Sequence, residues 1–209
     1  MKRKALVGTV LLVLSSLLLG ACAVPQEEID KYIAELGELA GNLDAIDASA
    51  AQGNWEEAQS SLEQAKIHHS NIEEGINELE QKGVEPAQIA RGRAASTYLH
   101  KAVEIIDRML VVHRKTSELR PKMEVLSQGT QEDVARALDA LNELTLVIPD
   151  TKSSIKGFLD YANNYHSSNP EDARKLRVDT AIPKMEQLHT QLDVRETEFK
   201  GYIGTLSKS

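Results

Sequence analysis

Four residues of this 209-residue chain are of types that bind metals and fall where neighbouring helices could bring them together. His68 and His69 are adjacent, Glu73 follows His69 by one helical turn, and His100 comes later in the chain. Imidazole and carboxylate groups bind zinc or copper, and histidine also titrates near neutral pH. The set indicates a metal site or a pH switch, provided that folding makes the four side chains converge.

Histidines on a helix seam more often serve as core residues with a hydrogen-bond partner, and His68 and His100 can also face water. We therefore expect no metal and no other cofactor. The site formed by His68, His69, Glu73 and His100 remains the alternative.

The single cysteine, Cys22, has the surroundings of a processing site. It follows the basic residues Lys2–Lys4 and an apolar run, Ala5–Leu19, that is shorter than the roughly 20 residues a spanning helix needs. A charged start, a short apolar segment and small residues before the cleavage point are typical of an export signal. With no second cysteine, no intramolecular disulfide can form after export.

The residues before this cysteine, Leu19, Gly20 and Ala21, resemble the lipobox of bacterial lipoproteins. The resemblance covers residues 1–22 and implies that the signal is removed and that Cys22 carries diacylglycerol, with acylation of the new amino terminus as well. It implies an exported protein anchored to the cell membrane or, because Ala23 rather than Asp follows, to an outer membrane. The alternative is an ordinary secretory signal that is cut elsewhere and leaves a thiol.

These observations predict three parts: a signal peptide at 1–21, a lipidated cysteine with a short tether at 22–26, and one helical domain at 27–209. Removal of the signal leaves 21 basic against 32 acidic residues, a net charge of −11. Phosphate backbones and anionic lipid surfaces would repel such a body, so nucleic acid is not an expected partner.

Motifs for catalysis are missing from the sequence. It has no glycine-rich phosphate loop, no nucleophile elbow, and no cysteine spacing for a metal or haem. Glu186 and His189 form one Glu-x-x-His motif, whereas di-iron bundles use two such motifs and further carboxylates. We therefore expect a protein that is not an enzyme.

The body has helical apolar spacing almost throughout, which predicts an all-α fold, an antiparallel bundle of about five long helices with some kinked at proline. The first helix is expected from about Gln26 to Ala51. Asn54 and Glu57 then form a capping-box arrangement at the start of the second helix.

A helical hairpin formed by 54–82 and 86–120 is the central structural prediction. Both segments carry apolar or small residues at a 3-4 spacing, and Gly83 and Pro86 suit the turn between them. Folding back near residue 84 sets the register. The predicted opposing pairs are Leu79 with Ile89, Ile76 with Gly92, Ile72 with Ala95, Leu62 with Ile106, Trp55 with His113, and His69 with Leu99, beside His100.

Proline makes the later elements harder to define. Pro121 ends or kinks the third helix, Thr130 is the expected cap of the next, and Pro149 makes 131–166 either one kinked helix or two short ones. Asn169 and Pro170 are expected to open a last helix that reaches about residue 206, with a kink at Pro183.

Residues 53–65, "GNWEEAQSSLEQA", resemble the start of the second helix of a tetratricopeptide repeat. The resemblance rests on Gly53, Trp55, Ala58, Leu62 and Ala65, and no echo at the 34-residue repeat length follows. One capped helix with an apolar seam accounts for the same residues.

Two functions follow from these features. The first is a membrane-anchored envelope lipoprotein whose noncatalytic helical domain binds another envelope protein or acts as a scaffold. The alternative is a ligand-binding or metal-binding bundle, a sensor or carrier, that uses the layer formed by His68, His69, Glu73 and His100 or a groove between helices. An exposed apolar surface would favour the first, and convergent buried polar groups would favour the second.

Overall fold

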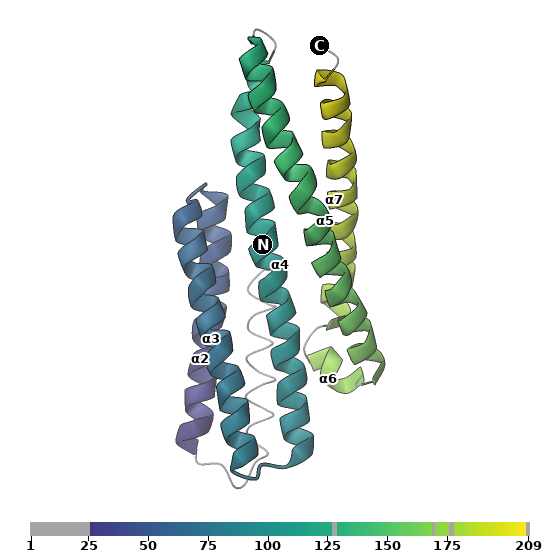
Figure 1. Ribbon diagram of the computed structural model, residues 1–209. Coiled ribbons are helices and arrows are strands. Elements are labelled where there is room, and N and C mark those ends of the chain that lie inside the picture. The colour runs from purple at the N-terminus through teal and green to yellow at the C-terminus, as the bar shows by residue number, and fades with distance from the viewer. Residues whose placement is uncertain (1–25, 127–128, 169, 176–177, 208–209) are drawn as a thin grey trace.

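The computed structural model describes residues 26–126, 129–168, 170–175 and 178–207 (Figure 1). The predicted signal peptide, the lipobox and Cys22 lie outside these residues, as does the expected cap Asn169. Every regular element in the described part is a helix, so the all-α prediction is confirmed. The helices are α2 (Gln26–Ala51), α3 (Trp55–Gln81), α4 (Pro86–Glu124), α5 (Gln131–Ser168), α6 (Pro170–Lys175) and α7 (Val178–Leu206). Among the residues searched, no helix is both long and apolar enough to cross a bilayer.

Each long helix packs mainly on its neighbours in the chain. Helix α3 contacts α2 on one side and α4 on the other, while α5 contacts α4 and α7 (Figure 1). The α2–α3 hairpin ends before α4 does, so the carboxyl-terminal part of α4 extends beyond it (Figure 1). The core is continuous across these junctions, and the rings of Tyr98 in α4 and Phe158 in α5 meet at its centre with their centroids 5.2 Å apart.

The turn residues and caps behave as the sequence predicts. Gly53 and Gly83 have φ angles of 75° and 80°, which favour glycine. The Asn54 side chain accepts from the Glu57 amide at 3.5 Å and donates to the Glu57 carboxylate at 2.7 Å. Thr130 caps α5: its hydroxyl accepts from the Asp133 amide at 3.4 Å, and its own amide donates to the Asp133 carboxylate at 2.9 Å.

Two contacts of the predicted α3–α4 register are present. A side chain placed on Gly92 would meet Ile76 at 3.6 Å, and the His69 ring lies beside that of His100. Ala58, Leu62 and Ala65 are fully buried along the same stripe of α3. Regular 3-4 spacing therefore predicted the buried stripe of α3 and the contact of Ile76 with Gly92.

At three places the structure differs from the expected helix boundaries or decides between the expected alternatives. Helix α4 continues through Pro121 to Glu124, and 131–168 forms one helix with Pro149 inside it. The expected single last helix is wrong: the chain forms α6 and then α7, and Pro183 lies within α7. Ala173 of α6 and Val178 of α7 are both fully buried.

Tyr32 locks α2 onto α3 at a position where α3 has no side chain. Its hydroxyl donates to the Gly75 carbonyl at 3.0 Å, and a Cβ atom on Gly75 would lie 1.6 Å from the Tyr32 ring. Helix α2 also holds Gly37, which has no atom within 4 Å of an added Cβ. The two glycines therefore allow a matched test.

We predict that Gly75→Ala lowers the free energy of unfolding by about 2 kcal/mol, because the Tyr32 ring must move out of a packed site. Gly37→Ala should instead raise it by up to about 1 kcal/mol, the usual gain of alanine over glycine inside a helix. Urea unfolding followed by circular dichroism measures both. Equal stabilisation by the two changes would contradict the docking of Tyr32 on Gly75.

Candidate functional site

The seam between α3 and α4 holds one buried imidazole with hydrogen-bond partners. The His69 side chain is 5% exposed, and its Nε2 atom lies 3.1 Å from both the carbonyl and the hydroxyl oxygen of Ser96. Such contacts are typical of a core histidine. They occupy one of the two ring nitrogens that could bind a metal.

A groove of about 410 Å³ opens beside this histidine. His100 lies at its edge, with its ring centroid 5.2 Å from that of His69, and Glu73 is 4.0 Å from His69 Nε2. Lys66 and Asp107 line the same groove and form an ion pair at 3.0 Å. The groove thus gathers mixed charges that already pair with one another.

His68, the fourth residue of the predicted set, faces the other side of α3. Its Nδ1 atom lies 2.7 Å from the Glu35 carboxylate in α2, and Asn71 donates to the same carboxylate oxygen at 3.1 Å. The hydrogen bond with His68 holds the pKa of Glu35 below its usual range. The structure therefore brings His69, Glu73 and His100 to one groove and separates His68 from them. No group of three His, Cys, Asp or Glu residues in the described part is arranged to hold a metal ion.

A larger cleft, of about 910 Å³, lies where the α2–α3 turn approaches α4 and α7. Trp55 lines it at the start of α3, immediately after the Asn54 cap. Helix α4 contributes residues at a 3-4 spacing, among them His113, Arg120 and Met123. Helix α7 contributes Arg195, Phe199 and Tyr202, which lie on one face because they are spaced by four and three residues.

The composition of this cleft is unusual for the chain. The sequence contains eight aromatic residues other than histidine, and three of them, Trp55, Phe199 and Tyr202, line this one cleft. Tyr202 is 48% exposed although it is a large side chain. Tryptophan, tyrosine and arginine are the residues that most often dominate the energy of protein interfaces. We name Trp55, Arg120, Met123, Arg195, Phe199 and Tyr202 the aromatic–arginine cleft.

Sequence reasoning found part of the cleft and missed the rest. The register predicts that Trp55 lies level with His113, and both line the cleft. No sequence pattern predicted that Arg120, Arg195 and Tyr202 belong to a site. The spacing of Arg195 and Tyr202 with Phe199 is the one pattern that relates them. Their convergence depends on where α7 lies, and no local pattern encodes that position.

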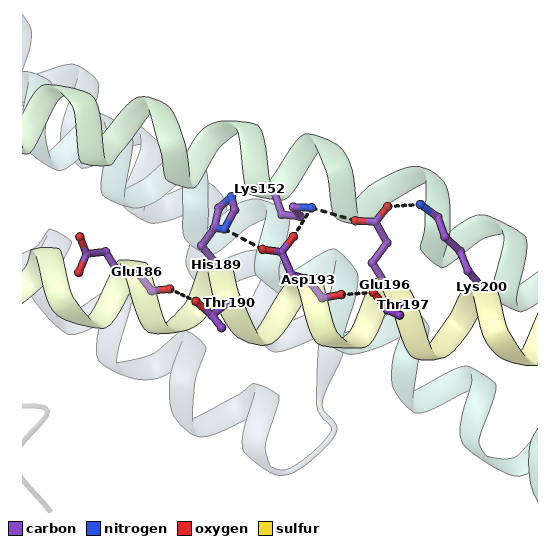
Figure 2. Close-up of polar contacts among 8 residues, drawn as sticks. All are labelled: Lys152, Glu186, His189, Thr190, Asp193, Glu196, Thr197 and Lys200. Carbon is purple, nitrogen blue, oxygen red and sulfur yellow. Dashed lines mark hydrogen bonds and ion pairs between the residues drawn. The ribbon is translucent and has the colours of Figure 1, made fainter.

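A third polar cluster joins α5 to α7 (Figure 2). Lys152 of α5 reaches between two carboxylates of α7: it bonds to Asp193 and lies 3.0 Å from Glu196. His189 contacts Asp193 at 3.3 Å, and Lys200 contacts Glu196 at 2.5 Å. The imidazole of the Glu-x-x-His motif therefore pairs with Asp193, one turn further along α7.

The charges in this cluster shift one another's titration. The hydrogen bond with Lys152 lowers the pKa of Asp193, and the bonds with Lys200 and then Lys152 lower that of Glu196. The same carboxylates raise the pKa of Lys152 above its ordinary value of 10.5. Both carboxyl shifts stabilise the fold above their ordinary values of 3.8 and 4.5, and that stabilisation is lost as the pH falls through the lower folded values. The lysine shift stabilises the fold below pH 10.5 and is lost as the pH rises through its higher folded value.

Lys152→Met is expected to lower the midpoint of thermal unfolding by about 2–4 °C between pH 6 and pH 9, because α5 loses its charged link to α7. The difference from the parent protein should shrink as the pH falls below 4, where the carboxylates become protonated. Lys200→Met is the matched control, because Lys200 bonds to Glu196 from the same helix and joins no second element. A difference between Lys152→Met and the parent that does not change with pH would contradict the ionic origin of the link.

Comparison of the chain with protein-family models, with curated proteins and with solved structures finds no match. The geometry of the groove beside His69, of the aromatic–arginine cleft and of the α5–α7 cluster is therefore the basis for any functional conclusion.

Proposed function

We propose that this chain is an exported, lipid-anchored protein whose noncatalytic helical domain binds another envelope protein through the aromatic–arginine cleft. The observation that carries the proposal is the gathering of Trp55, Tyr202, Arg120 and Arg195 around one cleft of about 910 Å³. Aromatic and arginine side chains supply large contact area and directional hydrogen bonds, so they are enriched where proteins bind one another.

The buried polar groups elsewhere support a binding role over a catalytic one. His69 is engaged by Ser96, and the buried hydroxyl of Thr151 donates to the Val147 carbonyl at 3.0 Å within its own helix. His69 is thus held in the α3–α4 seam and Thr151 within α5, so in the described residues these two buried polar groups serve packing.

The anchor is the second part of the proposal and depends on residues before α2. Two or three acyl chains at Cys22 would hold the protein stably at a membrane, whereas one chain gives marginal binding. Residues 23–26 would span roughly 14 Å when extended, so the start of α2 would remain close to the bilayer. A short tether of this kind suits a protein that binds a neighbour in the same envelope.

The protein purified from its native host is expected to partition into the detergent phase and to carry diacylglycerol. Cys22→Ser should move it to the aqueous phase or stall removal of the signal, because the serine hydroxyl cannot form the thioether. Ala23→Ser is the control and should leave the lipid in place. Mass spectrometry of the amino-terminal peptide decides the matter: an unlipidated Cys22 in the parent protein would refute the anchor.

The cleft is tested in the cell with a photoreactive benzoylphenylalanine in place of Tyr202. Irradiation should yield one main adduct with another envelope protein, because this ring is half exposed at the cleft. The same residue in place of Leu146 is the control, since Leu146 is 75% exposed on α5 and lies outside the cleft. Absence of an adduct at position 202, or identical adducts at both positions, would contradict the proposed binding surface.

A further inference from the structure

We infer that the aromatic–arginine cleft receives an amphipathic helix of a partner protein, with carboxylates of that helix against Arg120 and Arg195 and apolar side chains against Trp55 and Tyr202. The inference rests on the proposed function and specifies the kind of partner. It follows from four features of the described residues: a length mismatch between helices, the sign of the charges, the loose pairing of the arginines and the openness of the cleft.

The first feature is the mismatch between α4 and the hairpin that covers it. Helix α3 has 27 residues and α4 has 39, and the α2–α3 turn lies level with His113. From there α4 continues to Glu124, about 16 Å of helix. Beyond the turn, α4 keeps α5 as its neighbour while the α2–α3 hairpin is no longer beside it (Figure 1). A helix of about three turns would fit this length.

Two stripes of side chains run along the exposed segment in the direction of the helix axes. One lies on α4, at His113, Ser117 and Arg120, and the other on α7, at Arg195 and Tyr202. Spacings of three and four residues on both walls match the spacing at which another helix presents its own side chains. An occupying helix would extend the layer that α2 and α3 begin.

The second feature is charge. Two arginines line the cleft, against the single carboxylate of Asp47, while burial lowers the pKa of His113, which also lines it. The chain as a whole has 32 acidic against 24 basic residues, a net charge of −8. Arginines therefore outnumber carboxylates in the lining of the cleft, opposite to the balance of the chain as a whole, which favours an acidic occupant and disfavours a second copy of the same acidic body.

The third feature is how loosely the guanidinium groups are held. Arg120 contacts Glu124 at 3.2 Å and Arg195 contacts Glu198 at 3.4 Å, in each case within one helix. The Arg120 side chain is 82% exposed and that of Arg195 is 63% exposed. Exposed pairs of this type contribute little to stability, so both arginines can turn to carboxylates of a partner at small cost.

The fourth feature, the openness of the cleft, favours a helix over a small molecule as its occupant. Pockets for small molecules enclose most of the ligand surface. Here the rim is formed by side chains that remain largely in solvent, Arg120 and Tyr202 among them. An open groove with a half-buried floor of Trp55 and Met123 suits the apolar face of a helix, as in other grooves that bind helices.

The test uses Trp55 as reporter, because it is the single tryptophan of the chain and lies in the cleft. The full chain in phosphatidylcholine nanodiscs is titrated with a synthetic helical peptide of about three to four turns that carries leucine at a 3-4 spacing flanked by glutamate. A second peptide has lysine in place of glutamate, and a third has serine in place of leucine. We expect a saturable change of Trp55 fluorescence with the first peptide and at least tenfold weaker binding of the other two.

Exchange of the arginines should reverse the preference. In the double variant Arg120→Glu with Arg195→Glu, the lysine peptide should bind more tightly than the glutamate peptide, and Arg120→Gln with Arg195→Gln should bind both weakly. Arg136→Glu is the control, because Arg136 is exposed on α5 and pairs with Glu132 away from the cleft, and it should behave as the parent. Circular dichroism confirms that each variant is folded.

Three results would overturn the inference: no saturable response to the glutamate peptide, equal binding of both charged peptides, or an unchanged preference in the double Glu variant. Saturable binding of dodecanoate without peptide binding would make the cleft a small-molecule site and would overturn it too. The proposed function is judged separately by the adduct at position 202. An adduct with a partner that presents a basic or uncharged surface would leave the proposed function standing while this inference fails.

Discussion

The structure depends on α4 being covered along two sides by apolar side chains. The amino-terminal part of α4 packs between α3 and α5, and Tyr98 and Leu99 are almost fully buried there. Each large apolar side chain taken from water contributes about 1.5–3 kcal/mol, so a seam with Leu62 and Ile72 on the facing helix is a major part of the stability. Polar contacts such as that of Lys152 with Glu196 add specificity to the apolar packing, because they favour one position of α7 along α5.

The same constraint explains the cleft. The two helices of the hairpin are shorter than α4, so they cannot cover all of it. The α4 side chains beyond the level of the turn at Gly53 therefore have no neighbour in α3. Where the hairpin is present, its neighbour α4 is lined by apolar side chains such as Ile89 and Val103. Where the hairpin ends, the exposed stripe changes to His113, Ser117 and Arg120. The sequence of α4 thus records which part packs in the bundle and which part meets solvent or a partner.

Local patterns predicted what depends on neighbouring residues and missed what depends on distant ones. The caps at Asn54 and Thr130 and the contact of Ile76 with Gly92 follow from spacing and turn chemistry, and the structure has all three. The docking of Tyr32 on Gly75 could not be foreseen, because a glycine inside a helix pattern does not reveal which ring approaches it. The separation of His68 from His69 has a similar origin. Adjacent residues on a helix point about 100° apart, so one faces α4 and the other faces α2, and sharing a height does not make side chains converge.

The position of the cleft relative to the start of α2 bears on the proposed role in one further respect. Helix α2 has 26 residues, so Ala51 lies about 39 Å from Gln26 along the helix axis. The cleft begins at the Ala51 end, whereas a lipid at Cys22 would hold the Gln26 end near the bilayer. In the proposed arrangement, α2 and α3 therefore act as a rigid spacer that separates the binding surface from the attachment point. Because α3 is locked to α2 by Tyr32 and to α4 along the seam, this distance is set by packing. The cleft would then meet its partner at the far end of that spacer, with its reach fixed by the length of the hairpin.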